Sequence, residues 1–362
     1  MTDGAKPPKD DEFELTLLGP GYGESVVMHI GGGSWVLVDS CGRADAPAAP
    51  AALDYLGELG VDPAEAVKLV VASHWHDDHV RGMAAMASAC RTATFCCASV
   101  LCTEEFLAAV HALEHRHFAA FGSGAREIYD VFSKLRSEGS LPTLASANRR
   151  LFSKGACHIW ALSPADDTFL SFVRAIGGLL PKAGQAETRI RSLSPNEVAV
   201  VLWVEVGDIM VLLGSDLERR GWAKILQDDA RPTGTASAFK VPHHGAASGD
   251  APEVWQRMLD VDPAAVLTPW RRGNRMLPTS RDVQRILART PNAYATATTD
   301  AVRPARRDST VERTIRESGI RLRRPSAPSA VRLRRPIAAQ TQWQVELLGT
   351  ACHLREYEQV AS

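Results

Sequence analysis

Short apolar runs that alternate with polar, turn-forming stretches occur along the whole chain and predict a succession of β-strands and α-helices. The run at 67–73, Val-Lys-Leu-Val-Val-Ala-Ser, is typical of a buried strand. Two runs joined through Gly207-Asp208 predict a tight antiparallel pair. The full pattern predicts strands near 13–18, 25–30, 35–39, 67–72, 93–97, 157–162, 198–205, 209–213, 238–242, 264–268, 294–297 and 343–348, and helices near 47–59, 80–89, 103–136, 166–178, 217–228, 251–259 and 279–289. Mixed sheets with helices outside them indicate an α/β fold, a four-layer αββα sandwich.

Directly after the run at 67–73, three histidines and two aspartates occur within six residues, His74-Trp75-His76-Asp77-Asp78-His79. His74 and His76 are two positions apart, so in an extended segment both rings point the same way, roughly 6–7 Å apart at the backbone. Both imidazoles can then reach one metal ion, and Asp78 and His79 can reach a second ion beside it. The alternative is a polar loop with coincidental histidines.

Three other predicted strands end in residues that suit a metal site. The strand at 35–38 runs into Asp39, followed by Ser-Cys-Gly. The strand at 209–213 runs into Gly-Ser-Asp, which ends at Asp216, a carboxylate whose two oxygens can hold two cations. The strand before residue 240 runs into Lys-Val-Pro-His-His-Gly, which contains His243 and His244.

Together these motifs resemble the metallo-β-lactamase superfamily of metal-dependent hydrolases, whose fold is the αββα sandwich. The resemblance covers roughly residues 12–300, with four motifs in the expected order. It implies that Asp39 orients the metal-binding loop rather than binding metal, and that Asp216 bridges two ions. The combination of Gly-Ser-Asp with Lys-Val-Pro-His-His-Gly is more specific than the superfamily signature, and an Asn-containing stretch at 194–202 accompanies it. These resemble the branch typified by the hydrolase domain of the bacterial DNA-uptake protein ComEC and by phosphorylcholine esterases.

The resemblance implies a first ion bound by His74 and His76 and a second bound by Asp78, His79 and a late histidine. Either His243 or His244 can be this ligand; if it is His243, then His244 is free to meet the substrate or leaving group. Many members of the family have one more histidine ligand in the middle of the chain. Here four residues are candidates: His111, His115 and His117 in the predicted helix 103–136, and His158 in a predicted strand. If none of them is the ligand, one coordination position is left open.

Two divalent ions lower the pKa of a water molecule toward neutrality, so that hydroxide serves as the nucleophile. Asp78 is then the catalytic residue that holds and orients the nucleophile, with His244 as a second candidate catalytic residue. Imidazole and carboxylate ligands favour Zn²⁺, and the oxygen ligands also admit Mn²⁺. Lys240 precedes the histidine pair and is a candidate for binding a substrate phosphate; the alternative is a solvated lysine.

The remaining composition is that of an ordinary soluble protein. The chain has 362 residues, 45% hydrophobic and 23% charged, with a formal net charge of −1, so the overall charge says nothing about an anionic partner. No apolar run is long enough to span a membrane, and residues 1–11 lack the apolar core of a signal peptide, so we expect a cytoplasmic protein. Seven cysteines without a Cys-x-x-Cys pair argue against a disulfide framework.

Two regions lie outside the core pattern. Residues 103–150 form a predicted helical insertion in the hydrolase domain 12–300, either a lid over the site or a peripheral helical pair. Residues 301–362 form an arginine-rich tail that repeats Arg-Leu-Arg-Arg-Pro at 321–325 and 332–336, and its last strand is expected to return to the core. Its arginines suit phosphate binding, but a solvated linker is the alternative.

These observations predict a phosphodiesterase or a nuclease-like enzyme, with DNA or RNA among the substrates considered. A second hypothesis is a hydrolase of thioesters or lactones, because the same fold and metal centre serve both chemistries. A third is a catalytically silent binding protein on the same fold, against which the complete set of ligand residues argues.

Overall fold

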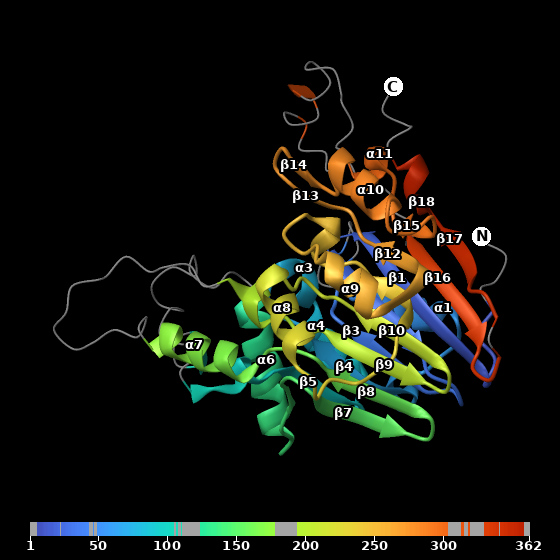
Figure 1. Ribbon diagram of the computed structural model, residues 1–362. Helices are drawn as coiled ribbons and strands as arrows, with labels where there is room; N and C mark the ends of the chain where they lie inside the picture. The colour runs from blue at the N-terminus through green and yellow to red at the C-terminus, as the bar shows by residue number, and fades with distance from the viewer. Residues whose placement is uncertain are drawn as a thin grey trace.

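Two mixed β-sheets lie face to face in the centre of the computed structural model (Figure 1). The structure describes residues 6–21, 23–42, 46, 49–104, 106–107, 110, 124–177, 194–302, 313–314, 318, 329–339 and 341–357. The first sheet has the order β17-β16-β1-β2-β3-β4-β5-β6, with β1 Glu12–Gly21, β2 Gly23–His29, β3 Trp35–Val38, β4 Val67–Ala72, β5 Thr94–Ala98, β6 Thr143–Ala145, β16 Ala330–Pro336 and β17 Gln344–Leu348. The second has the order β18-β15-β12-β11-β10-β9-β8-β7, with β7 Arg149–Lys154, β8 Cys157–Ala161, β9 Leu202–Val206, β10 Ile209–Leu213, β11 Ala236–Lys240, β12 Leu259–Leu267, β15 Ala293–Ala295 and β18 Cys352–His353.

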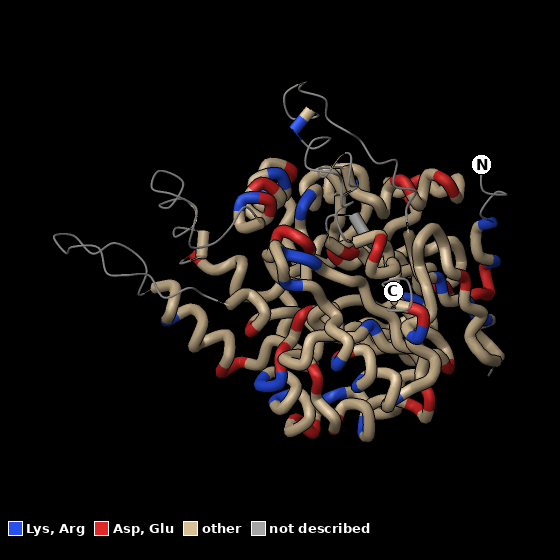
Figure 2. Tube along the Cα trace, turned by 90° about the horizontal axis from the view of Figure 1, so that it is seen from above, with Lys and Arg blue, Asp and Glu red and all other residues tan. Residues whose placement is uncertain are grey.

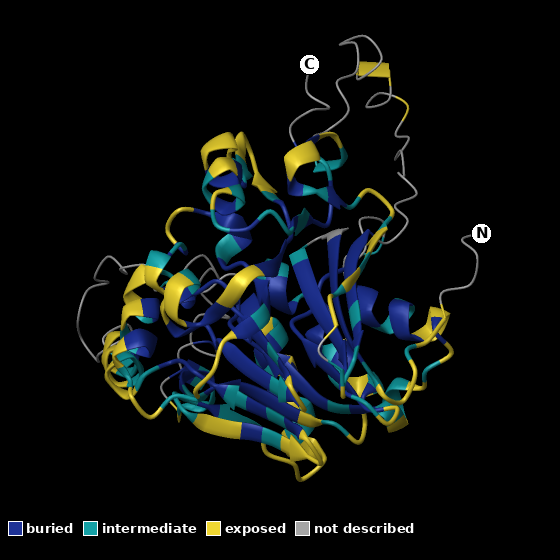
Figure 3. Cartoon of the chain, turned by 45° about the vertical axis from the view of Figure 1, so that its right-hand side comes forward, coloured by how far each residue is buried: buried dark blue, intermediate teal, exposed yellow. Residues whose placement is uncertain are grey.

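The helices lie on the outer sides of the two sheets, so the predicted four-layer sandwich is confirmed. The described helices are α1 Ala51–Glu58, α2 Pro63–Ala66, α3 Asp77–Val80, α4 Met83–Ala89, α6 Gly124–Ser137, α7 Asp166–Gly177, α8 Arg219–Gln227, α9 Pro252–Arg257, α10 Ser280–Leu287 and α11 Thr299–Val302. Short 3₁₀ turns occur at Ser99–Cys102, Pro195–Val198, His243–Gly245 and Leu354–Glu356. Figure 3 shows that the sheets are the buried part of the molecule and that exposed residues concentrate on helices and loops.

The period-two pattern of the strands separates the inner and outer faces of the second sheet. In β9, Leu202 and Val204 belong to the large core that also contains the first sheet, whereas Trp203 belongs to a second apolar cluster. That second cluster includes Trp222 of α8 and Val254 of α9, so these helices cover the outer face of the sheet. Apolar side chains on both faces explain why the central strands read as continuous apolar runs.

The arginine-rich tail contains a strand that sequence reading did not predict. Strand β16 pairs with β1 and β17 inside the first sheet. The Nε atom of Arg334 donates to Glu14 Oε2 over 2.7 Å, and Arg332 Nε donates to the Tyr55 hydroxyl over 2.8 Å. The linker interpretation is therefore wrong for the repeat at 332–336, which forms a strand and whose Arg332 and Arg334 side chains bind Tyr55 and Glu14 rather than being free for phosphate. The repeat at 321–325 lies outside the described residues.

The predicted insertion at 103–150 is helical only in part. Helix α6 lies within it, but β6 and the beginning of β7 also fall inside the range. Its possible role as a lid stays a prediction, because most of 105–123 lies outside the described residues. In the described part of the chain, no helix is both long and apolar enough to cross a membrane. All seven cysteines are free thiols. Acidic and basic residues are intermixed along the chain, as Figure 2 shows.

Stability is expected to depend on pH through the buried imidazole of His29. Burial lowers its pKa from the ordinary value of 6.5, although Glu12 O lies only 2.8 Å from Nδ1. As the pH falls, the imidazole of His29 therefore binds a proton in the unfolded chain before it does so in the folded chain. The contribution of the neutral His29 to stability is present above pH 6.5 and is lost as the pH falls toward the lower pKa of the folded state. Urea unfolding is expected to show a shallower decline of stability below that pH for His29→Gln than for the wild type. Identical declines would contradict a neutral, buried His29.

Candidate metal centre

The candidate site lies where the carboxyl ends of parallel strands from both sheets meet. Strands β3 and β4 are parallel in the first sheet, and β10, β11 and β12 are parallel in the second. Asp39 follows β3, the loop 74–79 follows β4, Asp216 follows β10, His244 lies just beyond β11, and Thr268 follows β12. These residues lie in the segments that follow the strands, among them α3 with Asp78 and His79, so the sheets fix where the segments begin and the segments direct the side chains.

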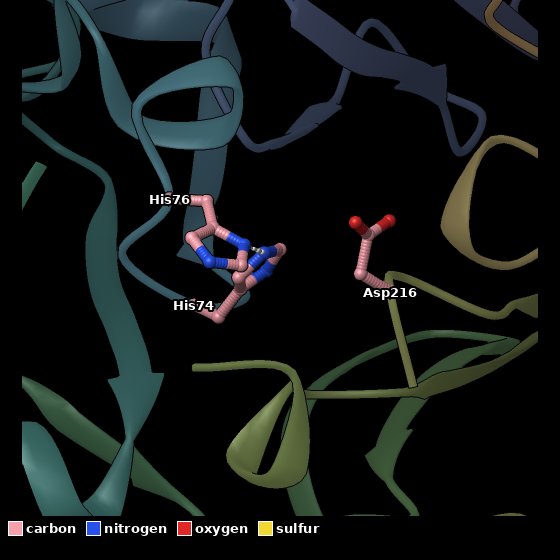
Figure 4. Close-up of side chains that lie close together, drawn as sticks. All are labelled: His74, His76 and Asp216. Carbon is pink, nitrogen blue, oxygen red and sulfur yellow. Dashed lines mark hydrogen bonds between the residues drawn. The ribbon is translucent and has the colours of Figure 1, made fainter. Parts of the chain in front are cut away.

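Two groups of three candidate ligand residues come together in this cluster, beside a third group, Glu24, Asp39 and His79, in which the His79 nitrogen Nδ1 is already bonded to Asp39. His74, His76 and Asp216 form one group, and Asp78, His79 and His244 form the other; within each group the candidate ligand atoms lie within 4.8 Å of one another. Figure 4 shows the two imidazoles of the first group side by side, with the Asp216 carboxylate across from them. Asp216 also reaches the second group, since its Oδ1 lies 3.5 Å from His79 Nε2 and its Oδ2 lies 3.8 Å from His244 Nε2.

The histidines are held as metal ligands are held in proteins, with one ring nitrogen bonded to the chain and the other facing the cluster. His74 Nδ1 lies 3.0 Å from Ser73 Oγ, which itself donates to Asp39 over 2.7 Å. His79 Nδ1 lies 2.8 Å from Asp39 Oδ2, and His244 Nδ1 lies 3.0 Å from the Thr268 carbonyl.

The remaining atoms point to cations. Both His79 Nε2 and Asp216 Oδ1 are buried without a hydrogen-bond partner in the described chain, which is costly unless another group satisfies them. His74 Nε2 and His76 Nδ1 face each other across 3.0 Å, as two nitrogens aimed at a common position do. The donor set of neutral imidazoles and carboxylates therefore fits divalent metal ions.

The charges of the cluster balance one another despite their burial. Burial alone would raise the pKa of Asp216, but the positive charges of His79 and His244 hold it well below its ordinary value of 3.8. Burial alone would lower the pKa of His79, yet Asp216 and Asp39 raise it well above its ordinary value of 6.5. Burial, together with the neighbouring imidazoles, lowers the pKa of His74 well below that value. Two carboxylates thus retain protons on nearby imidazoles, and divalent ions can replace those protons.

The backbone around the site is strained or tightly packed at three positions. Asp39 has a φ of 59° and His244 a φ of 54°, in the left-handed region that non-glycine residues rarely adopt. Gly23 has a φ of 88°, and a Cβ atom there would lie 1.7 Å from the carbonyl oxygen of Asp78. Only glycine therefore lets the start of β2 approach the metal loop.

The two adjacent late histidines have different surroundings. His244 is 2% exposed and lies in the second ligand group, with Nε2 3.2 Å from Asp78 Oδ2. His243 lies apart from both groups: its Nδ1 is 2.9 Å from Ser248 Oγ and 3.5 Å from Glu218 Oε1. Of the two late histidines, the structure thus brings His244 to the cluster and leaves His243 outside it.

Two other predicted residues have contacts that the sequence did not indicate. Lys240 is only 2% exposed, so the solvated interpretation is wrong. Its ammonium group forms an ion pair with Glu24, donates to Ser215 O over 2.9 Å and lies 3.7 Å from Asp216 Oδ1. Substrate binding by Lys240 stays an untested prediction. His158 lies in β8 outside both groups, with Nδ1 2.9 Å from Ser153 Oγ, whereas residues 111–117 lie outside the described residues.

Comparison with known proteins gives one family model and several solved structures. The family model described as "Metallo-beta-lactamase superfamily" matches residues 18–136, which include Asp39 and the loop 74–79. The chain has the metallo-β-lactamase fold. No match to a curated protein was found.

Several solved structures are similar to this metallo-β-lactamase fold chain. YhfI of Bacillus subtilis, a metallo-β-lactamase fold protein, is 13% identical over 63% of this chain and 70% of its own, with a TM-score of 0.33. Zn²⁺-bound PqqB of Methylobacterium extorquens is 12% identical over 59% of this chain and 58% of its own, with a TM-score of 0.29. A metallo-β-lactamase of Cronobacter sakazakii is 17% identical over 60% of this chain and 66% of its own, with a TM-score of 0.33.

The two late histidines offer a matched pair of variants. His244→Ala is expected to lower the affinity for divalent metal by at least about 10–100-fold, because it removes a ligand, whereas His243→Ala leaves the affinity nearly unchanged. Both positions have a positive φ, at 54° and 50°, so the backbone cost of alanine is similar. Competition with a chromophoric chelator measures the affinities, and circular dichroism checks the fold. An equal loss in His243→Ala would contradict the assignment.

Sequence reading missed three residues that shape the candidate metal site. Glu24 is buried at the start of β2, where an acidic residue inside an apolar strand was the available signal. Thr268 and Trp270 follow β12, a parallel strand of the second sheet. The other site residues also follow strands, so this position was the available signal. The Trp270 ring stacks on His244, with ring centroids 5.9 Å apart and 15° between the planes.

Proposed function

We propose that this metallo-β-lactamase fold protein is a hydrolase that cleaves phosphodiester bonds with two divalent cations. The observation that carries the proposal is the meeting of two ligand groups around Asp216 in one buried cluster. Two-cation centres of about 3.5–4 Å separation occur in phosphatases and nucleases, where they hold the attacking and leaving oxygens. The resemblance of residues 240–245 to the ComEC-like and phosphorylcholine-esterase motif favours a phosphodiester over a thioester or lactone.

Bound at this cluster, divalent cations would lower the pKa of a water molecule and polarise a phosphoryl oxygen. The side chains of the protein perform the positioning. Burial alone would raise the pKa of Asp78, but the hydrogen bond from His244 and the charge of His79 lower it, so this carboxylate is an anion at neutral pH. Asp78 therefore accepts hydrogen bonds and orients the attacking water rather than donating a proton.

His244 is better explained as a ligand than as a proton donor to the leaving group. Its Nδ1 is bonded to the Thr268 carbonyl, which requires a hydrogen on that nitrogen and leaves Nε2 for a cation. Asp39 keeps the role of a positioning residue, because its carboxylate bonds to both Ser73 and His79. With four imidazoles among the six ligand residues, we propose Zn²⁺ as the resident metal, with Mn²⁺ as the alternative.

A comparison of three substrate classes tests this proposal. Protein loaded with Zn²⁺ or with Mn²⁺ is assayed with bis(p-nitrophenyl) phosphate, an acyl thioester and a lactone. We expect turnover of the phosphodiester in at least one metal form, with little turnover of the other two. Hydrolysis of the thioester or lactone alone would replace the phosphodiesterase proposal with the second hypothesis. No turnover by metal-loaded protein would favour the binding protein.

A further inference from the structure

A short basic hairpin projects from the metal centre and is not used by the proposed chemistry. Strands β13 (Trp270–Arg272) and β14 (Arg275–Leu277) form a separate two-stranded antiparallel sheet. Gly273 has a φ of 60° and takes the first position of the two-residue turn, where a positive φ gives the twist that hairpins require.

The base of this hairpin contacts the metal site directly. Trp270 is its first residue and stacks on His244 with an interplanar angle of 15°. In the pairing register, Arg272 lies opposite Arg275, as Trp270 lies opposite Leu277. Opposite residues share a face and alternate residues return to it, so Arg272 and Arg275 lie on the same face as Trp270. Arg271 lies on the other face.

The hairpin has a positive charge that no described residue neutralises through an ion pair. Arg271, Arg272 and Arg275 are all exposed, and none forms a salt bridge with any described residue. The sequence contains no acidic residue between Asp262 and Asp282. Some arginines elsewhere in the described chain are paired, as Arg334 is with Glu14. The three unpaired arginines of this hairpin are available to bind anions, which guanidinium groups bind through two parallel hydrogen bonds.

We infer that this hairpin binds the phosphates that flank the scissile phosphate of a nucleic-acid strand. The inference rests on the proposed phosphodiesterase function and specifies its substrate as an oligonucleotide. A small phosphodiester has a single phosphate, which would be bound at the metal cluster. No second phosphate is then left for the arginines to bind. A nucleic-acid strand has further phosphates on both sides of the scissile one. Arg272 and Arg275 extend from the residue that stacks on a metal ligand, and so lie along the path of such a strand.

The test compares two substrates in the full-length, metal-loaded protein. The readout is kcat/KM for a single-stranded 12-nucleotide substrate divided by kcat/KM for bis(p-nitrophenyl) phosphate, with DNA and RNA of one sequence as separate arms. In Arg272→Gln/Arg275→Gln we expect this ratio to fall by about 10–100-fold in at least one arm, because two phosphate contacts are lost. Raising the salt concentration is expected to reduce the wild-type ratio more steeply than that of the double variant.

Arg271→Gln is the positional control, because it removes one guanidinium charge, against two in the double variant, from the opposite face of the same hairpin. We expect its substrate ratio to remain that of the wild type. If the wild type cleaves the small diester but the double variant keeps the wild-type ratio in both arms, the inference is overturned and the proposed function stands. An equal loss in Arg271→Gln would also overturn it, since general charge would then explain the effect. Failure of the wild type to cleave either substrate would overturn the proposed function and this inference together.

Discussion

Asp216→Asn is expected to reduce hydrolytic kcat/KM by about a thousand-fold, equivalent to about 4 kcal/mol of transition-state stabilisation. Asp216 is the residue that reaches both ligand groups, with its two oxygens near His79 and His244. Asparagine keeps the shape but offers one neutral oxygen, so the two cations lose the anion between them. Because the carboxylate is 2% exposed and faces imidazoles, the loss of its charge also leaves those cationic groups without compensation.

Asp77→Asn serves as the control for this change. Asp77 is the first residue of α3, next to the ligand residue Asp78; its carboxylate lies 3.9 Å from the Arg81 guanidinium, and it belongs to neither ligand group. We expect its kcat/KM to stay within a few-fold of the wild type, as surface ion pairs contribute little. Steady-state kinetics with bis(p-nitrophenyl) phosphate measures both variants. Similar activities for Asp216→Asn and Asp77→Asn would show that Asp216 has no part in the reaction.

Lys240→Met is expected to lower the free energy of unfolding by about 3–5 kcal/mol, because it leaves the carboxylate of Glu24 buried without its partner. Both residues are 2% exposed, and their charged groups form a direct ion pair. The same ammonium group also lies 3.7 Å from Asp216 Oδ1, so its loss removes part of the positive charge that faces this carboxylate. Urea unfolding in the presence of a chelator measures the effect without a contribution from bound metal.

The double variant Glu24→Gln/Lys240→Met separates charge compensation from packing. Removing the carboxylate and the ammonium group together leaves no buried unpaired charge at Glu24, so we expect the double variant to be more stable than Lys240→Met alone. A double variant that is destabilised by the sum of the two single changes would show that the ion pair has no role. A stable Lys240→Met would contradict the buried pairing itself.

Much of the fold follows from apolar periodicity alone. The strand predicted at 209–213 coincides with β10, and the one predicted at 67–72 coincides with β4, because both are continuous apolar runs in the centre of a sheet. The loop 74–79 follows as a metal-binding loop from its ligand types and from its place after a strand. The remaining ligands come from the ends of strands in the other sheet, and only the resemblance to a known family connects them to this loop.

Other features depend on contacts that are distant in sequence. Strand β16 contains apolar residues at alternate positions, but its arginines resemble a solvated segment until Arg334 meets Glu14, 320 residues away. The choice between His243 and His244 likewise depends on other elements. The carbonyl of Thr268 and the carboxylate of Asp78 fix His244, and neither is recognisable as its partner from the local sequence.

Metal content is the most direct test of the central claim that two ligand groups form one dinuclear centre. Elemental analysis of the purified protein, dialysed against buffer containing Zn²⁺ and then against metal-free buffer, is compared between the wild type and Asp216→Asn. We predict two metal ions per chain in the wild type and fewer than two in the variant. A wild-type protein that retains no stoichiometric metal, or an Asp216→Asn variant that keeps both ions, would contradict the account.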